Sequence, residues 1–285
     1  MKMKWGQLIE PLGGGAVGTA CLVRLGSGAL AVEKHANSSD EELRSLLRGE
    51  GRLCAFYRGA QEFIQMIAAC FDDEPALLFE YADGRSLRDR IKKHGRQSEA
   101  DVRAMLVVTM SGLIKMRANG HVHRDLKPEN IFIKEGQFKL GDLGHAHGAP
   151  RTVGTYPRAG TKAYQAPESK RGLATTASDV YSLGIVGQEM LLGRRKGPGT
   201  VRSARSDVSS ALVGLLELMR SPNPAARPTP EQVLAILDGA KDLDPNPSPP
   251  APEKQIDWGK VGVYGLIVLG IVIAGLFLVR WLQRK

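Results

Sequence analysis

The sequence predicts an α+β fold with a small β-rich part followed by a larger helical part, and one C-terminal helix that spans a membrane. Three features predict it. Short apolar runs punctuated by glycine occupy residues 6–80. Residues 98–119 are apolar at helical spacing, with Ser98 placed as the N-cap and Gly120 as the C-cap. Residues 261–279 carry no charge, and as a helix they are about 28 Å long, close to the ~30 Å core of a bilayer.

The bulk composition suits one sizeable globular unit. The chain has 285 residues, of which 42% are hydrophobic and 24% charged, values well away from a disordered composition. Its three cysteines lack the paired spacing of a zinc or redox site, and no N-terminal signal peptide is evident, so we expect a cytosolic unit. The net charge of +9 comes without a basic, aromatic-interleaved element, so we expect an anionic membrane surface as partner and no nucleic acid.

In chain order, the first expected elements are a strand, a glycine turn and a second strand. The turn is the run GGGAVG at residues 13–18, whose glycines allow a left-handed backbone and close approach to an anion. Such a run is a weak signal by itself. The next strand-like segment ends at Lys34, a helix carrying Glu50 follows, and residues 76–84 are typical of a buried strand that runs into a turn.

The run HVHRDLKPEN at residues 121–130 carries the strongest chemical signal. Asp125 can accept a hydrogen bond from an attacking hydroxyl, Lys127 can neutralise a moving phosphoryl group, and Asn130 can hold magnesium. Taken singly, these residues could also cap a turn, point into solvent and bond the local backbone. Their combination makes that alternative weak.

This run resembles the catalytic loop of eukaryotic-type (Hanks-type) serine/threonine protein kinases, and the composition favours a bacterial member. The resemblance implies a bilobal kinase fold over residues 6–240, with a small β-rich N-lobe at 6–80 and a larger helical C-lobe at 84–240. It also implies ATP with magnesium, or manganese in its place, as cofactors and proteins as substrates.

The resemblance also implies an ATP site. Lys34 ends a segment like the third kinase strand and would contact phosphates while paired with Glu50, chosen over Glu41 and Glu42 nearer the helix start. A solvated role for Glu50 stays open, partly because Gly51 follows it. The implied nucleotide-binding positions are Gly13, Gly14, Gly15, Ala16, Val17, Gly18, Ala20, Val32, Lys34, Phe79, Glu80, Tyr81 and Ala82. Ala20 and Val32 exchange the family's usual valine and alanine, which predicts that both face the same purine.

A β-hairpin after Asn130 is expected to present the run DLG at residues 142–144, in which Asp142 would bind magnesium with Asn130. The run APE at residues 166–168 would close the activation segment. Within that segment Thr155 is the first candidate for a regulatory phosphate and Thr152 the second, since Arg124 could pair with the phosphate. The resemblance assigns scaffold roles to His123, Arg124, Thr161, Glu168, Asp179 and Arg227, with Thr161 bonding Asp125 and Lys127 and with Arg227 pairing with Glu168.

The C-terminal part is expected to anchor the chain in a membrane. The proline-rich run at 242–257 is a semi-rigid linker, 261–279 is the span, and 280–285 is a short basic tail. ATP chemistry favours a kinase domain facing the cytoplasm, although the basic tail favours the opposite orientation. Gly270 and Ala274 form a small-xxx-small pair, so a homodimer through this helix or through the kinase domain stays open.

Together these features predict a membrane-anchored serine/threonine protein kinase that autophosphorylates its activation segment. One alternative is a catalytically weak pseudokinase that serves as a membrane scaffold, which Leu143 and the exchanged pocket residues permit. A second is a small-molecule kinase of related fold. Lys127, Thr161 and the run at 166–168 are typical of kinases with protein substrates and argue against it.

Overall fold

The structure, a computed structural model, describes residues 3–14, 18–36, 40–148, 162–195 and 205–239. The strands are β1 (Gly6–Gly14), β2 (Gly18–Leu25), β3 (Leu30–Ala36), β4 (Met66–Cys70), β5 (Ala76–Glu80), β6 (His121–Val122), β7 (Ile131–Lys134), β8 (Gln137–Leu140) and β9 (His147–Gly148). The helices are α1 (Glu41–Phe56), α2 (Leu87–His94), α3 (Glu99–Ala118), α4 (Thr176–Leu192), α6 (Ser210–Met219) and α7 (Pro230–Leu237). Single 3-10 turns are η1 (Pro128–Asn130), η2 (Leu143–His145), η3 (Ser169–Arg171) and η4 (Pro224–Ala226).

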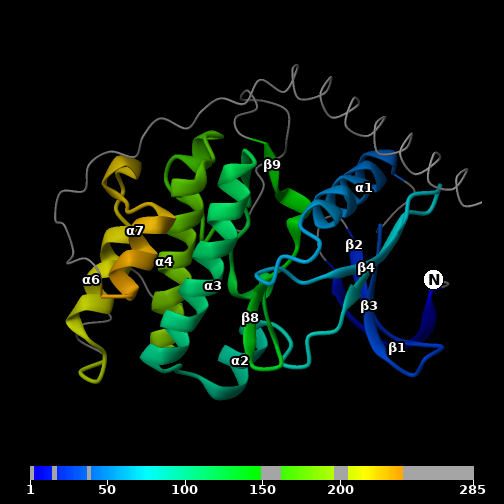
Figure 1. The fold of residues 1–285 in the computed structure, drawn as a ribbon, viewed down its shortest axis with the longest axis horizontal. Coiled ribbons are helices and arrows are strands. Elements are labelled where there is room, and N and C mark those ends of the chain that lie inside the picture. The colour runs from blue at the N-terminus through cyan, green and yellow to red at the C-terminus, as the bar shows by residue number, and fades with distance from the viewer. Residues whose placement is uncertain (1–2, 15–17, 37–39, 149–161, 196–204, 240–285) are drawn as a thin grey trace, which may run out of the picture. The chain divides into compact units, whose positions relative to one another are not determined.

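The N-terminal part is a five-stranded antiparallel sheet with strand order β1-β2-β3-β5-β4, packed against α1 (Figure 1). β3 lies in the middle of the sheet, and its side chains alternate between the two faces. Ala31, Glu33 and His35 are buried, whereas Val32 and Lys34 are only partly buried. The alternation therefore places Val32 and Lys34 together on one face of the central strand.

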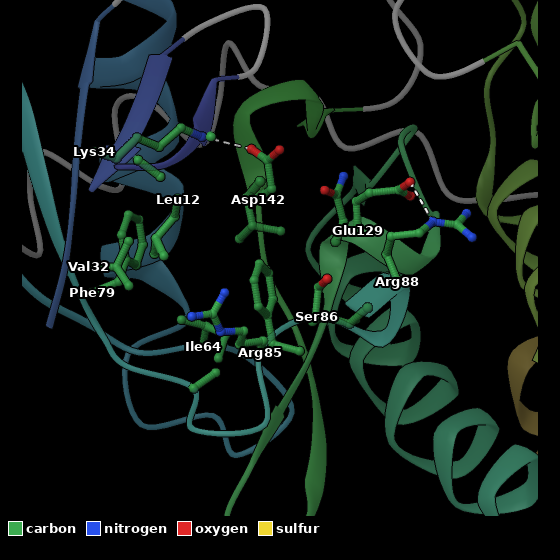
Figure 2. Close-up of a pocket in the computed structure, with 18 of the residues that line it drawn as sticks. Leu12, Val32, Lys34, Ile64, Phe79, Arg85, Ser86, Arg88, Glu129 and Asp142 are labelled. Atoms are coloured by element: carbon green, nitrogen blue, oxygen red, sulfur yellow. Dashed lines mark hydrogen bonds and ion pairs between the residues drawn. The ribbon is translucent and has the colours of Figure 1, made fainter. Parts of the chain in front are cut away.

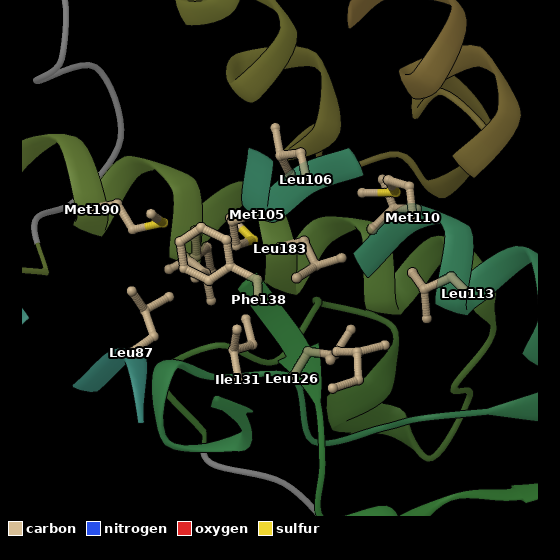
Figure 3. Packing of buried hydrophobic residues seen from close by; sticks show 14 of the residues in the cluster. Leu87, Met105, Leu106, Met110, Leu113, Leu126, Ile131, Phe138, Leu183 and Met190 are labelled. Atoms are coloured by element: carbon tan, nitrogen blue, oxygen red, sulfur yellow. The ribbon is translucent and has the colours of Figure 1, made fainter. Parts of the chain in front are cut away.

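The C-terminal part is helical and has its core along α3, which packs against α4, α7 and β8. Met105, Leu106, Met110, Leu113 and Met116 on α3 are each at most 1% exposed. Figure 3 shows this core, in which the Phe138 ring from β8 reaches between the helices. The β-sheet N-lobe and the helical C-lobe confirm the bilobal architecture that the sequence predicted.

α3 begins where the sequence predicted and ends one residue earlier. The Ser98 hydroxyl accepts the backbone N–H of Asp101, and the Asp101 carboxylate accepts the backbone N–H of Ser98, so a full capping box fixes the start. The C-cap is Asn119, and the expected C-cap Gly120 follows it at φ = 68°. Gly120 thus takes the left-handed position just beyond the helix, where glycine is favoured.

The hairpin of β7 and β8 brings two predicted metal-binding segments together. Its two turn residues, Glu135 (φ = 52°) and Gly136 (φ = 77°), are both left-handed, as a two-residue hairpin turn requires. The pairing sets Ile131 opposite Leu140, so the chain before β7 and the chain after β8 lie at the same end. The backbone N–H of Gly141 accordingly donates to the carbonyl of Asn130 at 3.0 Å.

Among the residues that the structure describes, no helix is both long and apolar enough to cross a membrane. The predicted linker at 242–257, span at 261–279 and tail at 280–285 lie outside the described residues.

Candidate active site

A pocket of about 560 Å³ lies against β1, β2 and β3 on one side and the catalytic-loop residues and β8 on the other (Figure 2). Its volume is typical of pockets that bind small molecules. Nine of the predicted nucleotide-binding positions lie on its wall besides Lys34: Gly13, Gly14, Gly18, Ala20, Val32, Phe79, Glu80, Tyr81 and Ala82. The predicted positions Gly15, Ala16 and Val17 lie outside the described residues.

Lys34 joins two carboxylates that are far apart in the sequence. Its Nζ lies 2.9 Å and 2.8 Å from the two carboxylate oxygens of Glu50 on α1, and 2.9 Å from Oδ1 of Asp142. Figure 2 shows the Lys34–Asp142 contact across the top of the pocket. The structure thus forms the Lys34–Glu50 pair that the sequence predicted and adds Asp142 to it.

Burial and charge set the protonation of this group. Burial acts to lower the pKa of Lys34, but the Glu50 and Asp142 charges outweigh it and raise that pKa above its usual value. Burial acts to raise the pKa of Asp142, but the Lys34 charge holds it well below its usual range. Burial raises the pKa of Glu50 to about 7, because Lys34 offsets only part of the cost. The group therefore contains an ammonium and an ionised Asp142, and burial makes Glu50 the carboxyl that is harder to ionise.

Gly51, which counted against Glu50 in the sequence, proves to be a packing requirement. A Cβ at Gly51 would lie 2.6 Å from Cδ2 of Leu77 on β5 and 2.8 Å from the Phe71 ring. Only glycine lets α1 approach the sheet this closely. Because Glu50 is the preceding residue on α1, this close approach also sets the distance from Glu50 to Lys34.

The last two residues of the DLG run, Leu143 and Gly144, lie close to α1 and Glu50. Leu143 is 3% exposed and lies in η2, which packs against α1. A Cβ at Gly144 would lie 3.0 Å from Oε2 of Glu50. Leucine therefore fills the apolar position beneath the Glu50 helix.

The catalytic-loop residues form a second polar group. Lys127 Nζ lies 2.7 Å from Oδ2 of Asp125. Asn130 Nδ2 donates to the backbone carbonyl of Asp125 at 2.8 Å and to its Oδ2 at 3.0 Å. Lys127 and Asn130 thus fix the orientation of the Asp125 carboxylate, and Asp125 as a residue is only 4% exposed.

Backbone strain in the loop is held by a buried acid from α4. Arg124, just before Asp125, is left-handed at φ = 70°, a costly conformation for a residue with a side chain. Asp179, 1% exposed, accepts the backbone N–H of His123 at 2.8 Å and of Arg124 at 2.9 Å. His123 is itself fully buried, with Nε2 3.3 Å from the carbonyl oxygen of Gly141. This gives the predicted scaffold residues a physical role, which is to hold the catalytic loop in a strained conformation.

Asn130 and Asp142 offer a suitable pair of oxygen ligands for a hard divalent cation. Since Asn130 donates through Nδ2 to Asp125, its Oδ1 is the atom left for a metal. Asp142 has a carboxylate that stays ionised, on a left-handed backbone at φ = 55°. Magnesium usually keeps several waters and phosphate oxygens as ligands, so two protein ligands fit it. Within the described part of the chain no cluster of three His, Cys, Asp or Glu side chains could hold a metal.

The pairing predicted between Glu168 and Arg227 is present deep in the C-lobe. Arg227, 2% exposed, donates through NH2 to Oε2 of Glu168 at 2.9 Å and through NH1 to Oε1 at 2.5 Å. This bidentate pair is a scaffold contact. Thr152, Thr155 and Thr161, also singled out in the sequence, lie outside the described residues.

Sequence reasoning missed an arginine network beside the catalytic loop. Arg88 on α2 contacts Glu129 through Nε at 2.8 Å, Glu189 on α4 through NH1 at 2.7 Å and the Tyr164 hydroxyl through NH2 at 2.6 Å. Figure 2 shows Arg88 and Glu129 on the C-lobe side of the pocket. No local pattern reveals this contact, because its four members come from four separate segments.

Several wall residues were also missed. These are Leu12, Ile64, Phe132 and Ser86, among others. One signal could have found Phe132, since its neighbours Ile131 and Ile133 in β7 are buried and it must point to the other face.

The amino-acid sequence matches one protein family and is similar to known kinases. The family described as "Protein kinase domain" matches residues 7–236. The serine/threonine-protein kinase PknA of Mycobacterium tuberculosis is 34% identical over 273 residues, covering 86% of this chain and 63% of that protein. The probable serine/threonine-protein kinase PknB of Bifidobacterium longum is 31% identical over 205 residues, covering 66% and 30%. The chain thus spans less than two thirds of the length of these relatives.

Proposed function

This chain belongs to the protein kinase domain family, and on that premise we propose that it transfers the γ-phosphate of ATP to serine and threonine hydroxyls of proteins. The observation that carries the proposal is the contact of Lys34 Nζ with Glu50 and Asp142, each at 2.9 Å or less. It joins a strand, a helix and the DLG run into one charged group on the wall of the pocket. The names of the relatives support serine and threonine as acceptors.

Each charged residue then has a role in positioning and electrostatics, which carry most of the catalysis in phosphoryl transfer. Asp125, oriented by Lys127 and Asn130, accepts the hydrogen bond of the attacking hydroxyl and orients it. Lys127 Nζ, 2.7 Å from Asp125, stands where it can neutralise charge that develops between the acceptor and the phosphate. Lys34 would hold the other phosphates, and Glu50 keeps its ammonium in place.

Magnesium ATP, when bound, supplies the phosphoryl group and a divalent charge. Asn130 Oδ1 and the Asp142 carboxylate would hold the metal. Val32, Ala20 and Phe79 would exclude water around the base, since all three lie on the pocket wall and are partly buried.

The presence of all four expected active-site residues disfavours a pseudokinase scaffold. Such a protein need not retain Lys34, Asp125, Asn130 and Asp142 together, and here each has the contacts described above. We further propose that residues 261–279 anchor the chain in a membrane with the kinase domain in the cytoplasm, and that the activation segment is autophosphorylated. The uncharged stretch of the sequence supports the first, and Arg124 beside Asp125 supports the second.

The test is phosphoryl transfer by the full 285-residue chain from γ-labelled ATP, alone and with a general protein substrate. We expect label on serine or threonine with the wild type and none with Asp125→Asn, while both bind a fluorescent ATP analogue with similar affinity. Asp238→Asn, an exposed carboxyl at the end of α7, is the matched control and should be fully active. Nucleotide binding without any transfer by the wild type would favour the scaffold.

A further inference from the structure

A patch of positive charge lies on the C-lobe. We define the α2–α4 basic patch as Lys92 and Lys93 in the last turn of α2, Arg96 just after α2, and Arg194 and Arg195 just after α4. All five side chains are exposed. Within the described residues none of the five forms an ion pair or a hydrogen bond to a carboxylate.

The two halves of the patch are packed together. A Cβ at Gly193, which ends α4, would lie 2.8 Å from the backbone nitrogen of Arg96 and 2.9 Å from the carbonyl carbon of Gly95. The N–H of Gln97 donates to the carbonyl of Met190 at 2.8 Å. The ends of α2 and α4 are therefore in contact, and their five cations share one region of the surface.

The surrounding acids offset only part of the patch. Asp89 keeps its charge, because its capping-box partner Ser86 is neutral, but it is one acid beside five cations. Asp101 accepts from Arg90 at 2.6 Å, and Asp207, close enough to influence Arg96, accepts twice from Arg205 at 2.7 Å. The helix dipole explains cations at the end of α2. It does not explain the remaining three, Arg96, Arg194 and Arg195. The sequence that continues from Arg195, at 196–204, contains no acidic residue.

The patch is continuous with the active-site cleft. Lys92 lies on the wall of the same pocket as Lys127 and Asn130. The Arg195 guanidinium lies 5.8 Å from the centre of the Tyr164 ring, and Tyr164 contacts Arg88. Arg88 in turn pairs with Glu129 and Glu189.

Arg88 carries one positive charge and pairs with two glutamates, so this group offsets part of the basic patch, whose five cations still outnumber it. A chain that leaves the cleft across the α2–α4 basic patch therefore meets net positive charge there. Like charges on that chain would be repelled and acidic residues attracted.

We propose that the α2–α4 basic patch binds acidic residues of the protein substrate beside the serine or threonine that is phosphorylated. This inference rests on the proposed kinase function and specifies its substrate class. Continuity with the cleft favours a substrate over a membrane surface as the occupant, because only a substrate must reach Asp125. The attraction is between exposed charges, so it lowers the KM for the substrate and weakens with ionic strength.

The test compares threonine peptides of matched length whose flanking residues are glutamate, glutamine or lysine. Using the full chain in a neutral detergent, we expect a KM for the glutamate peptide about ten-fold below that for the glutamine peptide, at similar kcat, since exposed ion pairs each contribute little. The triple variant Lys93→Glu, Arg96→Glu, Arg194→Glu should remove this preference. The control Arg24→Glu, Arg52→Glu, Arg58→Glu changes the charge equally with exposed N-lobe residues and should keep it.

Binding of a fluorescent glutamate-rich peptide, followed by anisotropy, tests the patch without catalysis. We expect the patch variant to bind about ten-fold more weakly than the control variant. Equal binding by both variants, or equal KM values for the three wild-type peptides, overturns the proposal. If no peptide is phosphorylated but the patch variant still loses peptide binding, the kinase function fails and the patch stands. If the patch variant changes only binding to vesicles of equal phosphatidylcholine and phosphatidylserine, the occupant is a membrane and the proposal is wrong.

Discussion

Asp179 on α4 holds the backbone of Arg124 in a left-handed conformation by accepting its N–H at 2.9 Å. The same carboxylate accepts the N–H of His123, so two buried donors depend on one acid. A helix of the C-lobe core thereby fixes the residue that immediately precedes the catalytic aspartate.

Asp179→Ala should therefore impair both folding and catalysis. It leaves two buried N–H groups without an acceptor, at a cost of about 1–3 kcal/mol each, so we expect the free energy of unfolding to fall by about 2–6 kcal/mol. The kcat should also fall, with little change in the KM for ATP, because Asp125 loses its support. Urea unfolding and steady-state kinetics measure both effects. Asp238→Ala should leave both unchanged, and an unaltered kcat in folded Asp179→Ala would refute the positioning role.

Two neighbouring glycines of α1 should respond oppositely to alanine. Gly51→Ala places a methyl 2.6 Å from Leu77, so we expect a loss of about 1–3 kcal/mol in the free energy of unfolding. Activity should also fall, because α1 must move and carries Glu50 with it. Gly49→Ala meets nothing within 4 Å and should stabilise the fold by up to about 1 kcal/mol. Thermal unfolding and kinase assays of Gly51→Ala and Gly49→Ala measure both effects. Equal stability and activity of the two variants would contradict the packing described for α1.

Glu50 should make stability depend on pH. Burial raises its pKa from 4.5 to about 7, so the folded chain binds this proton more tightly than the unfolded chain. This tighter proton binding adds about 3 kcal/mol to the free energy of unfolding below pH 4.5, and the added stability is lost as the pH rises to 7. Glu50→Gln cannot ionise and should remove this loss.

The measurement is urea unfolding of both proteins at several pH values from 5 to 8. Asp179, whose pKa burial also raises to about 7, and His121 and His123, whose pKa values burial lowers, are unchanged in the variant, so their contributions cancel in the difference. A difference in unfolding free energy between wild type and Glu50→Gln that does not vary with pH would show that Glu50 has an ordinary pKa.

Val32 is expected to contact the purine of ATP. Val32→Ala removes two methyl groups from the pocket wall, and each buried carbon contributes about 0.8 kcal/mol, so nucleotide affinity should fall roughly ten-fold. Val107→Ala, at an exposed position on α3, is the control. Titration with a fluorescent ATP analogue measures the affinity. Unchanged affinity in Val32→Ala would remove this residue, and its exchange with Ala20, from the adenine site.

Thr155 is expected to carry the regulatory phosphate, with Thr152 as second choice. A phosphate near Arg124 would add charge-assisted hydrogen bonds that order the activation segment. Thr155→Ala should therefore lower kcat several-fold, and Thr152→Ala less. Phosphopeptide mapping of active wild-type protein provides the direct check. The absence of phosphate between residues 145 and 160 would exclude both threonines.

The catalytic loop and the helix starts could be predicted from the sequence because their contacts are local. Asp125, Lys127 and Asn130 lie within six positions, so any fold that closes this loop brings them together. Ser98 and Asp101 complete a capping box within one turn of α3. Spacing along the chain determines contacts of this kind before any tertiary packing.

Only the tertiary structure decided how the distant charges meet. Lys34 reaches Asp142, 108 positions away, because β3 lies in the middle of the sheet and the β7–β8 hairpin presents the DLG run opposite it. Gly51 is unfavourable for a helix by itself, but the packing of Leu77 against α1 leaves no space for a side chain at this position. Such contacts depend on which surfaces pack together, and a residue's neighbours in sequence carry no information about its neighbours across a lobe.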